Sequence, residues 1–215
     1  MKVLSLLYPP RCIFCGAKLG RNAEKIHICG DCQKSLPYIW KQKPVQDVVA
    51  PWHYRDAVRA AIRRFKFTGA VSYARTFGWV MAQCVNSGDF DAVTWVPCSF
   101  LRRLKRRFDQ SRLLAKEVAL VLDKPLLRLL RRERHGKPQF RQADARQRRE
   151  NVRGAFAARS KAAAGMRVLL VDDIYTTGAT FEECRRMLKT AGAVSVTMLC
   201  VARARQKVHS SSRNY

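Results

Sequence analysis

Two adjacent carboxylates stand directly before a loop of small hydroxyl residues and glycine. The run from Val168 to Thr180 reads VLLVDDIYTTGAT. Ionised carboxylates accept hydrogen bonds from sugar hydroxyls, and the backbone amides of such a loop bind a phosphate. We therefore expect Asp172 and Asp173 to hold the 2′- and 3′-hydroxyls of a ribose. The residues expected to bind its 5′-phosphate are Thr176, Thr177, Gly178, Ala179 and Thr180.

The flanking residues predict the elements that position this run. Val168 to Val171 are all apolar, which is typical of a parallel strand buried on both faces. Helical spacing follows, with a predicted buried stripe of Phe181, Cys184, Leu188 and Ala191. The charged residues expected to face away from it are Glu182, Glu183, Arg185, Arg186 and Lys189. Gly192 is typical of a helix end, and Val194 to Val201 predict a second strand, which completes a right-handed crossover unit.

Other phosphate-binding motifs are missing from the chain. There is no GxxxxGK[ST] and no GxGxxG after a strand, which excludes a Walker A lysine and a dinucleotide fingerprint. The run resembles the signature of a phosphoribosyltransferase. The alternative is an ordinary strand end whose two acids only cap the next turn.

Two cysteine pairs near the N-terminus have the spacing of a metal site. Cys12-x-x-Cys15 is followed thirteen residues later by Cys29-x-x-Cys32, which brings four thiolates onto one tetrahedral ion. We expect zinc, and four cysteines leave no open coordination position, so the site is interpreted as structural. Two disulfides are the alternative, but Val3 to Tyr8 is too short for a secretory core.

The chain divides into a small module and one larger α/β domain. We expect a zinc ribbon over residues 1–40, a connector over 41–51, the larger domain over 52–205 and a disordered tail over 206–215. The first forty residues have too little apolar content for a core of their own, so zinc would supply much of their folding free energy.

Further periodicities outline the rest of the larger domain. Helical spacing runs from Tyr54 to Gln83 with an interruption at 65–69, and Ala92 to Pro97 predicts a strand that enters a loop. Ser111 to Val121 predicts a helix. Leu126 to Leu130 fits a short strand, although its pattern also permits a helix.

The charge balance points to an anionic polymer. The chain has 42 Lys and Arg against 16 Asp and Glu, a formal net charge of +26. Three basic stretches, 102–107, 128–134 and 141–153, have aromatic residues nearby that would stack on unpaired bases. The residues expected to contact nucleic acid are Arg102, Arg103, Lys105, Arg106, Arg107, Arg131, Arg132, Arg148 and Arg149. A solvated basic face is the alternative for each stretch.

Taken together, these motifs resemble the ComF family, bacterial competence-associated proteins with a cysteine ribbon before a phosphoribosyltransferase-type domain. The resemblance covers nearly the whole chain. The matching parts stand in family order: the two CxxC pairs, Tyr54 with Phe65-Lys66-Phe67, Pro97 with Arg102 and 106–110, 149–156, and 168–180. Two positions depart from the family, which has glycine at the place of Arg107 and asparagine at the place of Asp109.

The resemblance implies a type I phosphoribosyltransferase-like parallel sheet flanked by helices, with the zinc ribbon at its N-terminus. It implies phosphoribosyl pyrophosphate as ligand, with Mg²⁺ bridging the pyrophosphate. Asp172 and Asp173 would be catalytic together with Arg102 and Arg103, which would neutralise the leaving group. A solvated basic face is again the alternative for the two arginines.

Three functions follow from this resemblance. The first is assistance in the uptake or handling of single-stranded DNA during natural transformation. The others are an active phosphoribosyltransferase of nucleotide or base salvage and a non-catalytic sensor of phosphoribosyl pyrophosphate. The implied location is the cytoplasm or the inner face of the membrane, with a competence helicase or a DNA channel as protein partner. The apolar runs are too short to span a bilayer.

Overall fold

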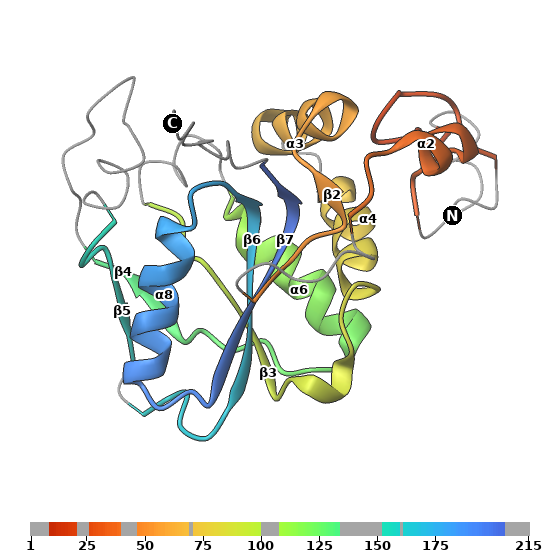
Figure 1. Ribbon diagram of the computed structural model, residues 1–215. Coiled ribbons are helices and arrows are strands. Elements are labelled where there is room, and N and C mark those ends of the chain that lie inside the picture. The colour runs from red at the N-terminus through yellow and green to blue at the C-terminus, as the bar shows by residue number, and fades with distance from the viewer. Residues whose placement is uncertain are drawn as a thin grey trace, which may run out of the picture.

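A parallel sheet forms the centre of the protein. The computed structural model describes residues 9–20, 26–39, 47–68, 71–99, 108–133, 152–159 and 161–204. Its main sheet has five strands, in the order β1 (Val48–Val49), β7 (Ser195–Arg203), β6 (Arg167–Tyr175) and β3 (Ala92–Trp95), with β2 (Trp52–His53) pairing farther along β7. Every pair in it is parallel (Figure 1). The predicted fold class is therefore confirmed.

Both faces of the sheet are covered, because side chains alternate along the strands. Leu169, Val171 and Leu199 belong to one hydrophobic cluster, together with residues of the helices α3 (Asp56–Thr68), α4 (Val71–Ala82) and α6 (Gln110–Leu122). Val168, Leu170 and Met198 belong to a second cluster. It is completed by α8 (Ala179–Thr190) and by the antiparallel pair β4 (Leu130–Arg132) and β5 (Phe156–Ala158) (Figure 1).

Helix α6 begins and ends at capping residues. The Asp109 carboxylate accepts a hydrogen bond from the Arg112 amide at 3.2 Å, and Asp123 ends the helix at a positive φ of 53°. Asp109 stands where the ComF family has asparagine, and either residue caps a helix well. The departure at this position thus preserves the start of α6, two residues before Ser111.

Several element boundaries differ from the sequence predictions. The predicted strand 168–171 continues to Tyr175, because hydrogen bonding to β7 extends through the pairs Asp172–Cys200 and Tyr175–Arg203. Within the predicted connector, Val48 and Val49 form β1 and pair with β7. Leu126 makes an isolated bridge to Val93, and β4 begins only at Leu130. A short 3-10 helix, Ser87–Asp89, precedes β3.

The cysteine-rich segment packs directly on the larger core. The Phe14 ring lies 5.4 Å from the ring of Trp52 and 6.1 Å from that of Phe77, both in edge-on contact. Arg64 of α3 donates from Nη2 to the carbonyl oxygens of Ile13 and Phe14, at 2.9 and 2.7 Å. The same cysteine-rich segment contains the short helix α2 (Gly30–Ser35) (Figure 1). The ribbon therefore contributes side chains to a core that it could not build alone.

A glycine allows two core helices to approach closely. A Cβ built on Gly78 of α4 would lie 2.4 Å from Cβ of Glu117 on α6. Real Cβ contacts are not that short, and neither backbone has room to yield in a close-packed interior. Gly78 thus sets how closely α4 and α6 pack against each other.

We predict that Gly78→Ala lowers the free energy of unfolding by about 1–3 kcal/mol, because overpacking outweighs the gain in helix propensity. Urea unfolding followed by circular dichroism measures this change. Gly88→Ala is the matched control, since its Cβ would meet nothing closer than 3.7 Å. Equal stability of the two variants would contradict the packing account.

Candidate functional site

The two acids lie at the carboxyl end of β6. They belong to the strand itself rather than to the following loop, so the β-ladder holds their backbone. Ligands of open parallel sheets bind beyond the carboxyl ends of the strands. The structure thus presents Asp172 and Asp173 at the edge where this fold class binds its ligands.

Asp172 is held by two hydrogen bonds to one carboxylate oxygen. Ser111 Oγ of α6 donates to Asp172 Oδ1 at 2.7 Å, and the Asp173 amide donates to the same atom at 2.8 Å. Burial raises the pKa of Asp172 to about 7, and the negative charge of Asp173 adds to this rise. The two hydrogen bonds and the charge of Lys66 oppose it. The carboxyl group therefore changes its protonation near neutral pH.

Asp173 has a cationic partner. Lys66 Nζ, in the last turn of α3, lies 2.8 Å from Asp173 Oδ2, and the two side chains are only 17% and 15% exposed. An ion pair this sheltered is screened far less than a surface pair. Lys66 thus compensates one of two adjacent negative charges.

The loop after β6 leads directly into a helix N-terminus. Gly178 has a φ of 81°, and a Cβ there would lie 2.6 Å from the Tyr175 hydroxyl oxygen, so both the backbone and the space require glycine. Helix α8 starts at Ala179. Since Gly178 has no side chain to cap the first turn, the amides of that turn remain available to an anion.

One predicted exposed residue is buried. Glu183 of α8 was expected to face away from the core, yet it is 8% exposed. Its Oε1 accepts a hydrogen bond from the Gly154 amide at 2.8 Å, and Arg186 donates to both carboxylate oxygens at 2.8 and 3.0 Å. These contacts lower the pKa of Glu183, with Arg186 as the main cause. Glu183 therefore ties the segment before β5 to α8.

A groove of about 770 Å³ runs along this side of α8. Thr177, Gly178 and Ala179 of the phosphate loop line one part of it. Four cations also line it: Arg153, Arg185, Arg186 and Lys189. Glu182 and Glu183 offset part of this charge. The volume is in the range of small-ligand sites, and the lining favours an anion.

The predicted basic residues are only partly described. Arg131 lies on β4 in an exposed ion pair with Glu133, at 2.6 Å, and the Arg132 guanidinium lies 5.1 Å from the centre of the Phe156 ring. The others lie outside the described residues: Arg102, Arg103, Lys105, Arg106, Arg107, Arg148 and Arg149. The predicted tail, 206–215, also lies outside them.

Two contacts of the site had no role in the sequence prediction. Ser111 starts the predicted helix 111–121 and Lys66 belongs to the Phe65-Lys66-Phe67 motif, but only the fold reveals that they contact the acids. A lysine between two aromatic residues at a helix end is the one local signal that marks Lys66 as unusual. Ser111 carries no such signal, because serine is common near helix starts.

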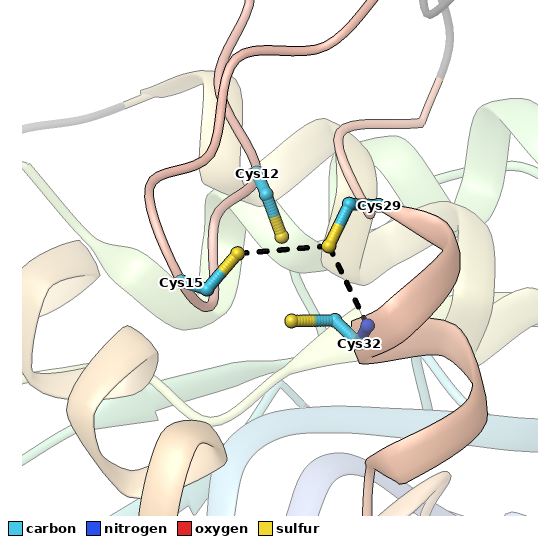
Figure 2. Close-up of side chains that lie close together, drawn as sticks. All are labelled: Cys12, Cys15, Cys29 and Cys32. Atoms are coloured by element: carbon cyan, nitrogen blue, oxygen red, sulfur yellow. Dashed lines mark hydrogen bonds between the residues drawn. The ribbon is translucent and has the colours of Figure 1, made fainter.

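The four predicted metal ligands come together. All four Sγ atoms lie within 4.8 Å of one another, and Figure 2 shows them directed toward a common space. Cys15 and Cys29 are 3.6 Å apart at sulfur, close to the ~3.8 Å between thiolates on a tetrahedral zinc ion. Cys29 Sγ also accepts a hydrogen bond from the Cys32 amide at 3.4 Å. The arrangement fits a structural zinc ion bound by Cys12, Cys15, Cys29 and Cys32.

Two family models match the chain. The phosphoribosyl transferase domain matches residues 109–214, which include both acids and the phosphate loop. The double zinc ribbon domain matches residues 3–46, which include all four clustered cysteines. Within the described ranges, no helix combines the length and apolar character needed to cross a membrane.

Relatives with curated names match nearly the full length. Competence protein F of Haemophilus influenzae is 30% identical over 91% of this chain and 85% of its own. Competence protein ComFC of Bacillus subtilis is 28% identical, over 90% and 78%. DNA utilization protein YhgH of Salmonella typhi is 27% identical, over 89% and 83%.

Among solved structures, glutamine phosphoribosylpyrophosphate amidotransferase from B. subtilis, complexed with ADP and GMP, is 24% identical with a TM-score of 0.44, over 64% of this chain and 30% of that chain. The family assignment rests on the sequence relatives and on the two family models. With a phosphoribosyltransferase-type sheet, a four-cysteine ribbon and near full-length similarity to Competence protein F, the chain belongs to the ComF family of competence-associated phosphoribosyltransferase-like proteins.

Proposed function

We propose that this protein binds phosphoribosyl pyrophosphate and assists the handling of single-stranded DNA during natural transformation. The observation that carries the first part is the acidic pair at the end of β6, with Ser111 on one acid and Lys66 on the other. The names of the relatives and the groove along α8 support the second part.

The acids and the loop suit the two ends of a ribose 5-phosphate. Asp172 and Asp173 would accept hydrogen bonds from the 2′- and 3′-hydroxyls, and such bonds to charged acceptors are stronger than neutral ones. The loop Thr176 to Thr180 would bind the 5′-phosphate through its amides and hydroxyls. The order of groups along the chain is the order of groups along the ligand.

The pyrophosphate end of the ligand calls for positive charge. Arg102 and Arg103 remain our proposed residues for neutralising it. Magnesium, when bound with the pyrophosphate, would compensate charge that develops as that group departs.

An active transferase of nucleotide or base salvage is the second candidate. A carboxyl group whose pKa lies near 7, as for Asp172, is suited to proton transfer at neutral pH. Pyrophosphate release with a base or an amine as acceptor would establish this function. Donor binding without release for any acceptor would identify a sensor instead.

The groove along α8 is our proposed contact for the nucleic acid. Its cations Arg153 and Lys189 are exposed, and the chain as a whole carries a formal net charge of +26. Phosphodiester strands bind to such surfaces with release of counterions. We propose a cytoplasmic location, at the inner face of the membrane during uptake, with a competence helicase or DNA channel as protein partner.

We expect the double substitution Asp172→Asn/Asp173→Asn to weaken binding of magnesium phosphoribosyl pyrophosphate by about 100-fold or more, because two charge-assisted hydrogen bonds are lost. Calorimetric titration of the zinc-loaded protein measures the affinity. Asp89→Asn, at an exposed carboxylate of the 3-10 helix, is the control and should bind like the wild type. Equal affinity of all three proteins would refute a sugar site at the acids.

The raised pKa of Asp172 predicts a pH-dependent stability. Because the pKa rises from its ordinary 3.8 to about 7, the folded state prefers the protonated acid. The stability from this group is complete below about pH 4 and is lost as the pH rises through about 7. Asp172→Asn has no proton to lose and retains an acceptor for Ser111.

We therefore expect Asp172→Asn to stabilise the ligand-free protein more at pH 8 than at pH 5.5, by about 1–2 kcal/mol. Urea unfolding at the two pH values measures this difference, and Asp89→Asn serves again as control. If the substitution raised the free energy of unfolding equally at both pH values, ionisation of Asp172 would not destabilise the folded protein.

For the nucleic acid, we expect Arg153→Glu/Lys189→Glu to weaken binding of a single-stranded oligonucleotide. The slope of the logarithm of the binding constant against the logarithm of the salt concentration should become shallower by about 0.7 for each phosphate contact removed. Fluorescence anisotropy at several salt concentrations measures both. Lys18→Glu/Lys34→Glu, at two exposed ribbon lysines, is the matched control. A loss confined to the ribbon variant would move the contact away from α8.

A further inference from the structure

The ion pair between Lys66 and Asp173 is unusual for a solvent-facing site. Both side chains are more than four-fifths buried, at 17% and 15% exposure, and their charged atoms are 2.8 Å apart. Removing two charges from water is costly, and a sheltered pair is therefore weak evidence for stability as such. Its partner, however, is one of the two acids proposed to bind the ribose.

The two residues before Lys66 fix the position of the helix end that carries it. The neighbouring Phe65 is fully buried, and its ring lies 5.9 Å from those of Phe77 on α4 and Phe108 before α6. Arg64, one residue earlier, donates to the carbonyls of Ile13 and Phe14 in the cysteine ribbon. The last turn of α3 is thus anchored by both residues before Lys66, and the Lys66 side chain itself is only 17% exposed.

Building on the proposed ligand site, we propose that Lys66 is a positioning residue for phosphoribosyl pyrophosphate: its ion pair compensates the charge of the Asp173 carboxylate and orients that group to accept a ribose hydroxyl. The ribbon contributes to this role, because Arg64 hydrogen-bonds α3, the helix that carries Lys66, to the ribbon backbone.

The electrostatics of the site explain why such a residue is needed. Asp172 and Asp173 are adjacent, and the charge of Lys66 on α3 acts on Asp172. The charge of Asp172 acts in turn on two buried thiols, Cys184 on α8 and Cys200 on β7. Burial raises the pKa of both thiols, so they are neutral at pH 7. Ser111 on α6 supplies a hydrogen bond but no charge.

Loss of Lys66 leaves this acidic pair without its cation. Because the charge of Lys66 lowers the pKa of Asp172, removal of that charge raises the pKa from its value of about 7. Asp172 then keeps its proton in a larger fraction of the molecules at neutral pH. Fewer ionised acceptors remain for the ribose hydroxyls, and binding shifts to higher pH.

The test is calorimetric titration of magnesium phosphoribosyl pyrophosphate at pH 6, 7 and 8 into zinc-loaded wild type, Lys66→Met, Lys66→Arg and Arg63→Met. We expect Lys66→Met to bind about tenfold more weakly at pH 7 and to recover in part at pH 8. Lys66→Arg should restore most of the affinity, because it restores the charge. Arg63→Met removes an exposed cation from the same helix and should bind like the wild type.

The outcomes separate this inference from the proposed function. Wild-type affinity and an unchanged pH profile in Lys66→Met would overturn the role of Lys66 and leave the ligand site intact. Absence of binding by the wild type would overturn both. A weakening that is equal at all three pH values and is not restored by arginine would also overturn the inference, because it would indicate a packing role.

A second measurement needs no ligand. Carboxyl ¹³C NMR titration of the free protein should show Asp172 titrating at higher pH in Lys66→Met than in the wild type, and an unshifted titration would overturn the proposal. If Lys66→Met does not fold, Lys66→Met/Asp173→Asn removes both charges and leaves no uncompensated ion. That double variant should then titrate at Asp172 as a single acid, without the mutual influence of the pair.

Discussion

Two neighbouring carboxylates at the end of a buried strand must be compensated, and much of this structure is arranged around that requirement. Successive residues of a strand point to opposite faces, so no single neighbour can satisfy both. Helix α6 brings Ser111 to Asp172, and helix α3 brings Lys66 to Asp173. Each helix in turn depends on a close contact elsewhere, α6 on Gly78 of α4 and α3 on the ribbon carbonyls.

The negative charge of Asp172 is only partly compensated, and this points to a functional role for the residue. The pKa of Asp172 stays near 7 in spite of two hydrogen bonds and a nearby cation. A site shaped only for stability would replace such a group with a neutral one. The cost in folding free energy is reasonable if hydroxyl groups of a ligand complete the set of donors, since functional sites often hold polar groups that the free protein leaves partly unsatisfied.

Much of this arrangement was predictable from sequence, for identifiable reasons. The buried strand, the loop with Gly178 and the buried stripe of α8 follow from local patterns, and the cysteine cluster follows from spacing alone. The partners of the acids did not follow, because Ser111 and Lys66 lie 61 and 107 residues away from them in the chain. Glu183 was misplaced for a related reason. A helix pattern predicts exposure for a charged residue, and only the position of Gly154 and Arg186 makes its burial acceptable.

Arg64 and Lys66 stand two residues apart on one helical turn. Successive residues of an α-helix are rotated by about 100°, so these two side chains leave the helix on nearly opposite sides. One reaches the backbone between the first two cysteines, and the other reaches the end of β6. A single helical turn thus connects the cysteine cluster to the acids of β6. A strain that opens the thiolate cluster, such as oxidation of its sulfurs, therefore acts on the same short segment that supports the sugar-binding edge of the sheet.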